Sequence, residues 1–176
     1  MNTPFDLRPR WNTAWHGLDI AVLRNDVEID RLHAPDVRRI VFAQPSHSTN
    51  AGALRFALVE LDEEFMLLPA ETGFAGRVHF ERQAFWAAKT CIYWVDAAQA
   101  RLPARCLGRR GLSLVRRSPC FGRLPRAELA PIVERWPLEG PHSWDERRWQ
   151  HIERSRPFAR LDTQPSSHSV SRLDTR

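Results

Sequence analysis

Apolar and polar residues alternate along the first part of the chain with the period of two that β-strands require. The segment Leu18–Leu32 shows this alternation on both sides of Asn25 and Asp26, two residue types that tolerate the positive φ of a tight turn. This pattern predicts a β-hairpin. The apolar run Val37–Ala43 predicts a third strand.

Two further apolar runs, Leu54–Leu61 and Phe65–Leu68, are separated by an acidic turn and predict a second hairpin. We expect the acidic residues to cluster at its tip, where water screens their mutual repulsion. These residues are Glu60, Asp62, Glu63 and Glu64.

From Arg77 the spacing of apolar residues changes to three, four and seven, which predicts a helix over Arg77–Lys89. The residues Cys91–Val95 have a high β preference but continue the same apolar stripe. We favour a continued helix there over a strand.

The C-terminal part is punctuated by proline and glycine. Leu112, Leu114 and Val115 suggest a short strand, and a short helix is predicted from Leu124, ending before Pro137. Pro131 fits the first turn of that helix better than its interior.

The sequence Ser143-Trp144-Asp145-Glu146 is a capping box, which predicts a last helix over Trp144–Arg154.

Together these elements predict an α+β fold: an antiparallel sheet or small, partly closed barrel of about five to seven strands with one long helix packed on it and two short C-terminal helices. In element order alone, not in sequence, this resembles pleckstrin-homology-like small barrels. From the N-terminus, the chain is predicted to consist of an arm (1–17), a core domain (18–124), a helical extension (125–154) and a disordered, serine-rich tail (155–176).

Charge is distributed unevenly over the 176 residues. Residues 1–100 carry 10 basic and 13 acidic side chains, whereas residues 101–176 carry 16 and 8. Lys89 is the only lysine, an arginine bias typical of a GC-rich, bacterial-type genome.

No acidic residue occurs between Ala97 and Ala127, and eight arginines lie there. They are candidates for binding an acidic protein surface or the phosphates of a nucleic acid. The simpler reading is a solvated region that the acidic first half neutralises. The eight are Arg101, Arg105, Arg109, Arg110, Arg116, Arg117, Arg123 and Arg126.

The polar residues Glu71, Arg77, His79 and Glu81 lie where the long helix is expected to begin. They suit an anion site, although capping of the helix explains them better. A hydrolase built on Glu71, His79 and Glu81 is a weaker alternative.

The sequence carries no cofactor or metal motif. Its three cysteines are widely spaced, and we expect free thiols, with an apolar context that raises the pKa of Cys91. There is no secretory signal and no apolar run of the length a membrane helix needs, so a cytoplasmic location is expected.

Trp136, Trp144 and Trp149 either dock the C-terminal helices or form a partner interface. The sequence therefore favours a non-enzymatic binding or adaptor domain with an arginine-rich surface for an acidic partner. The alternative is a nucleic-acid-associated protein that uses Arg101–Arg126.

Overall fold

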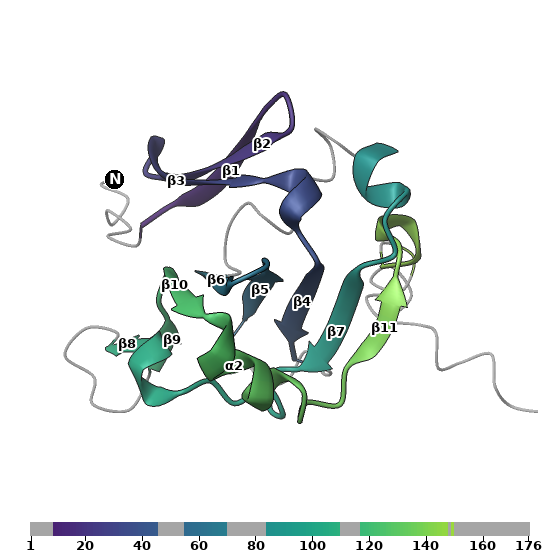
Figure 1. Cartoon of the computed structure of the whole chain (residues 1–176). Helices are drawn as coiled ribbons and strands as arrows, with labels where there is room; N and C mark the ends of the chain where they lie inside the picture. The colour runs from purple at the N-terminus through teal and green to yellow at the C-terminus, as the bar shows by residue number, and fades with distance from the viewer. Residues whose placement is uncertain (1–8, 46–54, 70–83, 110–116, 148, 150–176) are drawn as a thin grey trace, which may run out of the picture.

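The computed structural model describes residues 9–45, 55–69, 84–109, 117–147 and 149. These residues form a three-stranded antiparallel sheet, a six-stranded mixed sheet and a two-stranded ribbon (Figure 1). The described part of the chain is thus sheet-rich with short helices. Its largest sheet is open, with β10 and β11 at the edges, and does not close into a barrel.

The three-stranded sheet contains β1 (Trp11–His16), β2 (Asp19–Arg24) and β3 (Val27–His33), in that spatial order. Asn25 and Asp26 connect β2 to β3 with φ values of 52° and 65°, both in the left-handed region. A two-residue turn of this kind matches the right-handed twist of a hairpin, so the first predicted hairpin is confirmed.

Residues 11–16 therefore form a strand of this sheet, with Trp11 opposite Arg24. Both tryptophan rings of β1 pack on distant aromatic residues. The Trp11 ring stacks on Phe121 with 5.1 Å between centroids, and the Trp15 ring meets Trp86 edge-on at 5.9 Å.

The six-stranded sheet has the order β10-β6-β5-β4-β7-β11. The second predicted hairpin is confirmed in β5 and β6, and the third predicted strand in β4. All neighbouring strands are antiparallel except β4 and β7, which are parallel. The strands are β4 (Arg39–Gln44), β5 (Phe56–Glu60), β6 (Glu64–Pro69), β7 (Ile92–Asp96), β10 (Gly122–Pro125) and β11 (Glu139–His142).

The strand β7 corrects the expectation that Cys91–Val95 continues a helix. Residues 84–87 are helical, and the chain then turns and enters the sheet beside β4, with Ile92 opposite Ile40. Ile92 and Trp94 pack in one hydrophobic cluster and Val95 in another. A strand that is buried on both faces has apolar residues at consecutive positions. In so short a segment, this pattern cannot be distinguished from the apolar stripe of a helix.

Both faces of the six-stranded sheet are covered, and every residue of β5 is buried. On one face Ala57 and Val59 pack with Ile20 and Val22 of the three-stranded sheet and with Trp86. The other face is covered from below in Figure 1 by α2 (Arg126–Val133) and its surroundings. The buried residues on this second face include Phe56, Leu58, Leu129, Val133 and Trp136.

The predicted C-terminal helices are present where the chain is described. The helix α2 ends before Pro137 as expected, but it holds Pro131 inside it rather than in its first turn. Residues 144–147 and 149 are helical. The capping box is confirmed: the Ser143 N–H donates to the Glu146 carboxylate at 2.6 Å, and the Glu146 N–H donates to the Ser143 hydroxyl at 3.3 Å.

The expected pleckstrin-homology-like order of elements is not confirmed, since β7 and β11 follow the helical residues 84–87. The expected start of the long helix at Arg77, the strand around Leu114 and the tail from Ser155 lie outside the described residues. Within the described ranges, no helix combines the length and the apolar character needed to cross a bilayer.

Candidate functional site

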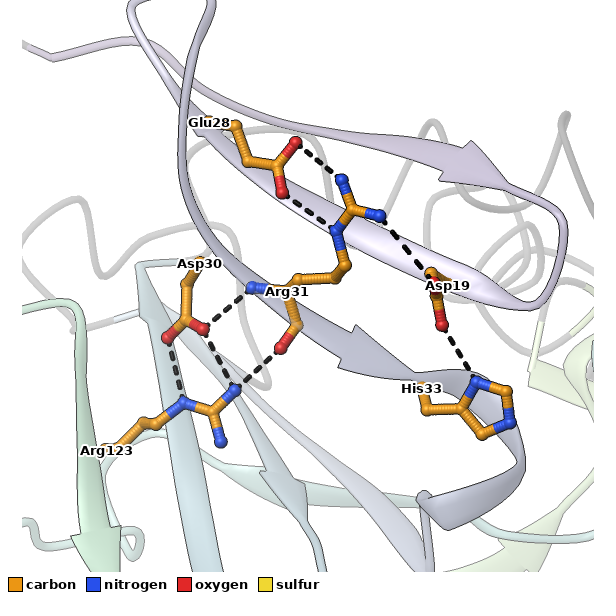
Figure 2. A network of polar contacts seen from close by, with 6 residues as sticks. All are labelled: Asp19, Glu28, Asp30, Arg31, His33 and Arg123. Atoms are coloured by element: carbon orange, nitrogen blue, oxygen red, sulfur yellow. Dashed lines mark hydrogen bonds and ion pairs between the residues drawn. The ribbon is translucent and has the colours of Figure 1, made fainter.

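Arg123 of β10 reaches across to β3 and joins the two larger sheets (Figure 2). Its Nε and Nη2 each donate to a carboxylate oxygen of Asp30 at 2.9 Å, and Nη2 also donates to the Arg31 carbonyl at 2.7 Å. A second ion pair joins Arg123 to Glu64 of β6. The hydrogen bond to Asp30 is the main cause that raises the pKa of Arg123. This arginine is committed to internal contacts.

Arg126, the first residue of α2, pairs with Glu60 at the end of β5, with Nε 2.7 Å from Oε1. The other Glu60 oxygen pairs with Arg39 of β4. The Glu60 side chain is only 4% exposed, so its expected place among the solvated carboxylates of the hairpin tip is wrong. The reason is that β10 and α2 pack over this end of the sheet, and two guanidiniums replace water around the carboxylate.

Arg105 and Arg101 lie nearer solvent. Arg105 forms an ion pair with Glu128 of α2, and the two side chains are 54% and 44% exposed. Arg101 is exposed. Of the four arginines in the acid-free block whose side chains are described, three are thus in ion pairs with acidic residues.

The remaining arginines of the block belong to the ribbon of β8 (Leu107–Arg109) and β9 (Arg117–Pro119). Arg109, the last residue of β8, and Arg117, the first residue of β9, are register partners. Arg110 and Arg116 follow and precede them in sequence and lie outside the described residues. The ribbon is a separate two-stranded sheet at the periphery of the molecule (Figure 1).

The outer surface of the three-stranded sheet carries a second polar network (Figure 2). Arg31 binds both oxygens of Glu28 at 2.8 and 3.0 Å and approaches Asp19 at 3.6 Å. His33 Nδ1 lies 2.8 Å from Asp19 Oδ1, and this hydrogen bond is the main cause that lowers the pKa of Asp19. These exposed pairs orient side chains along the sheet and contribute little to stability.

A hollow of about 310 Å³ lies between β3 and the β5–β6 turn. Its charged lining contains four carboxylates and two guanidiniums besides His33. Among the described residues, no group of three or more potential ligands is placed to hold a metal ion. The lining charges belong to Asp36, Asp62, Glu63, Glu64, Arg31 and Arg123.

The three C-terminal tryptophans do not form one surface. The Trp136 ring packs edge-on against Phe56 with 6.1 Å between centroids, and the Trp144 ring packs against Phe42 at the same distance. Both are buried in the core clusters, whereas Trp149 is 62% exposed. Docking of the C-terminal elements accounts for the first two, and Trp149 alone of the three is exposed.

Arg147 is a buried arginine whose burial was not predicted from the sequence. It is 6% exposed, and its guanidinium carbon lies 3.7 Å from the Phe42 ring centroid, 4.6 Å from Trp94 and 4.8 Å from Trp144. Its buried Nε has no hydrogen-bond acceptor among the described residues. Burial lowers its pKa to about 9, so the group remains protonated at neutral pH. Its position three residues after Trp144, on one helix face, was the available signal.

The described cysteines are free thiols, and burial raises the pKa of Cys91 as expected. The polar set Glu71, Arg77, His79 and Glu81 lies outside the described residues. No protein-family model, curated protein or solved structure matches the chain. The geometry of its arginines and their partners is therefore the basis on which its function has to be argued.

Proposed function

We propose that this chain is a non-enzymatic binding domain that contacts an acidic protein surface through the arginines of residues 101–117. The charge distribution supports this, because the segment between Ala97 and Ala127 contains no acidic residue. An uninterrupted basic segment attracts acidic surfaces and accelerates their association.

The ion pairs divide the arginine block into two groups. Arg123 and Arg126 hold the sheets and α2 together, and their charges are neutralised by Asp30, Glu64 and Glu60. The proposed binding group consists of the exposed Arg101 and Arg105 and the four arginines that follow them in sequence: Arg109, Arg110, Arg116 and Arg117.

The β8–β9 ribbon is the observation that carries the proposal. Its strand pairing brings Arg109 and Arg117 into register, and Arg110 and Arg116 adjoin them in sequence. Like charges opposite one another destabilise a strand pair, and a fold has no internal reason to concentrate them there. An acidic partner would relieve that repulsion.

Arg105 extends this group at the base of the ribbon. Its pair with Glu128 is exposed on both sides, and such pairs contribute at most about 1 kcal/mol. A carboxylate of a partner can replace Glu128 at little cost. We propose a cytoplasmic location, which suits the three free thiols of the described residues.

A nucleic-acid-associated function is the second candidate, and the shape of the ribbon favours it. A two-stranded antiparallel ribbon fits the major groove of DNA, and arginine binds phosphate and guanine with two parallel hydrogen bonds. The hydrolase alternative gains no support, because Glu71, His79 and Glu81 lie outside the described residues.

Fluorescence anisotropy with two probes separates the candidates: poly-L-glutamate and a DNA duplex of about 20 base pairs at low salt. We expect poly-L-glutamate to bind, and the charge-reversed variant R109E/R110E/R116E/R117E to lose that binding. Arg135→Glu is the matched control, since Arg135 is exposed at the end of α2, away from the ribbon in sequence.

Tight DNA binding that weakens steeply with salt, and is lost in the same variant, would replace the first candidate by the second. Absence of binding to both probes at low salt would overturn the role of the ribbon. Equal losses in the ribbon variant and in Arg135→Glu would show that net charge alone is responsible.

A further inference from the structure

Two free cysteines stand opposite each other at the base of the β8–β9 ribbon. Cys106 directly precedes β8 and Cys120 directly follows β9, and the first register pair of the ribbon is Leu107 with Pro119. The Cys120 N–H donates to the Cys106 carbonyl at 2.9 Å, which continues the ladder by one pair. From the sequence alone, the wide spacing of the three cysteines predicts only free thiols.

This backbone placement suits a disulfide. Directly opposed residues of antiparallel strands have Cα atoms about 4.5–5.5 Å apart, and disulfides join Cα atoms about 4.4–6.8 Å apart. Directly opposed residues also project from the same face of a strand pair. The bridge would therefore require little movement of the backbone.

The two thiols differ in their access to solvent. Cys120 is exposed, whereas Cys106 is 4% exposed and packs in the cluster beneath α2. Burial is the main cause that raises the pKa of Cys106, Arg105 opposes this shift, and Cys120 adds to it. An exposed thiol is accessible to an oxidant from solution, and a buried thiol close to it is placed to resolve the product.

We propose that Cys106 and Cys120 form a reversible disulfide that closes the base of the arginine-bearing ribbon. With a low-molecular-weight disulfide as oxidant, the Cys120 thiolate attacks one sulfur, forms a mixed disulfide and releases one thiolate. The Cys106 thiolate then attacks Sγ of Cys120 and releases the second thiolate. The two cysteines are oxidised by two electrons, which reduce the small disulfide, and the two protons that the cysteines lose pass through solvent to the two released thiolates, giving two small thiols.

The consequence for binding rests on the proposed function. A closed base restricts the motion of β8 against β9, so the backbone at Arg109 and Arg117 would be held in a narrower range of positions. Rigid presentation lowers the ordering cost of binding. We expect the oxidised form to bind poly-L-glutamate several-fold more tightly than the reduced form, a change of about 1 kcal/mol for a fivefold difference at 25 °C.

The test uses the full chain, reduced and then incubated with oxidised glutathione. Free thiols are counted by maleimide labelling under denaturing conditions, and disulfide-linked peptides are identified by mass spectrometry. The expected product has one labelled thiol, Cys91, and one linked peptide pair containing Cys106 and Cys120. Dithiothreitol should restore all three thiols.

Single substitutions give distinct expected products. Cys106→Ser should stop at the glutathione adduct of Cys120, and Cys120→Ser should remain unmodified. Cys91→Ser should form the bridge like the native chain, because Cys91 packs in the other core cluster. Circular dichroism checks that each variant folds.

A stable glutathione adduct on Cys120 in the native chain, a bridge that includes Cys91, or only bridges between molecules would each overturn the proposal. The thiol count needs no binding partner, so it stands or falls separately from the proposed function. If the bridge forms and the affinity for poly-L-glutamate is unchanged, the link to binding is overturned and the disulfide remains.

Discussion

Arg123 on β10 binds both carboxylate oxygens of Asp30 on β3, although 93 residues separate them in sequence. Figure 2 shows that the same guanidinium also reaches the carbonyl of Arg31. The backbone N–H of Arg31 is occupied too, since it donates to Asp30 Oδ1 at 2.7 Å. Side chains thus satisfy the backbone of β3 at this point of its free edge, where another strand would otherwise pair.

Substitution of Arg123 by lysine should weaken the connection between the sheets. A lysine keeps the charge but cannot make the two parallel hydrogen bonds, so we expect a loss of about 1–2 kcal/mol in the free energy of unfolding. Urea denaturation measures it, with Arg101→Lys as the control because Arg101 is exposed. Equal stability of the two variants would show that the contacts of Arg123 with β3 contribute no more to the free energy of unfolding than a surface arginine does.

Substitution of Glu60 by glutamine should destabilise the protein more than the same change at Glu63. The loss of the Glu60 charge leaves Arg39 and Arg126 facing each other without their shared partner. Breaking a buried pair costs about 3–5 kcal/mol, and we expect about 3 because Arg126 is 41% exposed and regains water.

Glu63 is the matched control for that experiment. It lies three residues further along the same hairpin and is exposed, so Glu63→Gln should change the free energy of unfolding by less than about 0.5 kcal/mol. A cost at Glu60 as small as that at Glu63 would mean that the carboxylate is solvated in solution, as the sequence had suggested.

Arg147 gives a prediction that depends on the chemistry of the cation. Lysine at this position would bury a more strongly hydrated ammonium and lose planar stacking on Phe42, whereas methionine removes the charge and keeps much of the volume. We therefore expect Arg147→Lys to be less stable than Arg147→Met by at least about 1 kcal/mol.

The same pair of substitutions at exposed Arg135 should differ by less than about 0.5 kcal/mol in urea denaturation. If the lysine variant of Arg147 matched or exceeded the methionine variant, positive charge rather than the stacked guanidinium would be what the aromatic residues require.

The capping box predicts a pH dependence. The backbone hydrogen bond from Ser143 is the main cause that lowers the pKa of Glu146 below its ordinary value of 4.5. The carboxylate therefore favours the folded state fully above that value, and its contribution is lost as the pH falls through the lower native pKa.

Glu146→Gln should accordingly lower the urea midpoint at about pH 7, and the difference from the native chain should shrink towards about pH 3. Glu134→Gln, at the exposed end of α2, is the control. A difference that stays constant over this pH range would assign the effect to the side-chain amide and not to the charge.

Several elements were predictable because their signals are local. The turn at Asn25 and Asp26 depends on residues that tolerate positive φ, and the box at Ser143 and Glu146 depends on a spacing of three. In each case the interacting groups are a few residues apart. The surrounding chain does not need to be known.

The prediction at Cys91–Val95 was wrong for an identifiable reason. Burial on both faces of β7 removes the alternation that marks a strand, so its apolar residues extended the helical pattern before it. The parallel pairing of β7 with β4 requires knowledge of the whole sheet. The prediction that Glu60 lies at the solvated tip of the hairpin was wrong for a similar reason, because its arginine partners lie 21 and 66 residues away.

The sequence by itself determined the hairpins, the capping of the last helix and the acid-free arginine segment, since these depend on residue type and short spacing. Only the tertiary structure decided which arginines are neutralised within the fold, which tryptophans are buried and which cysteines face each other. These properties depend on contacts between distant segments. Folding brings distant residues together, and these neighbours determine which charges form ion pairs and which thiols can form a disulfide.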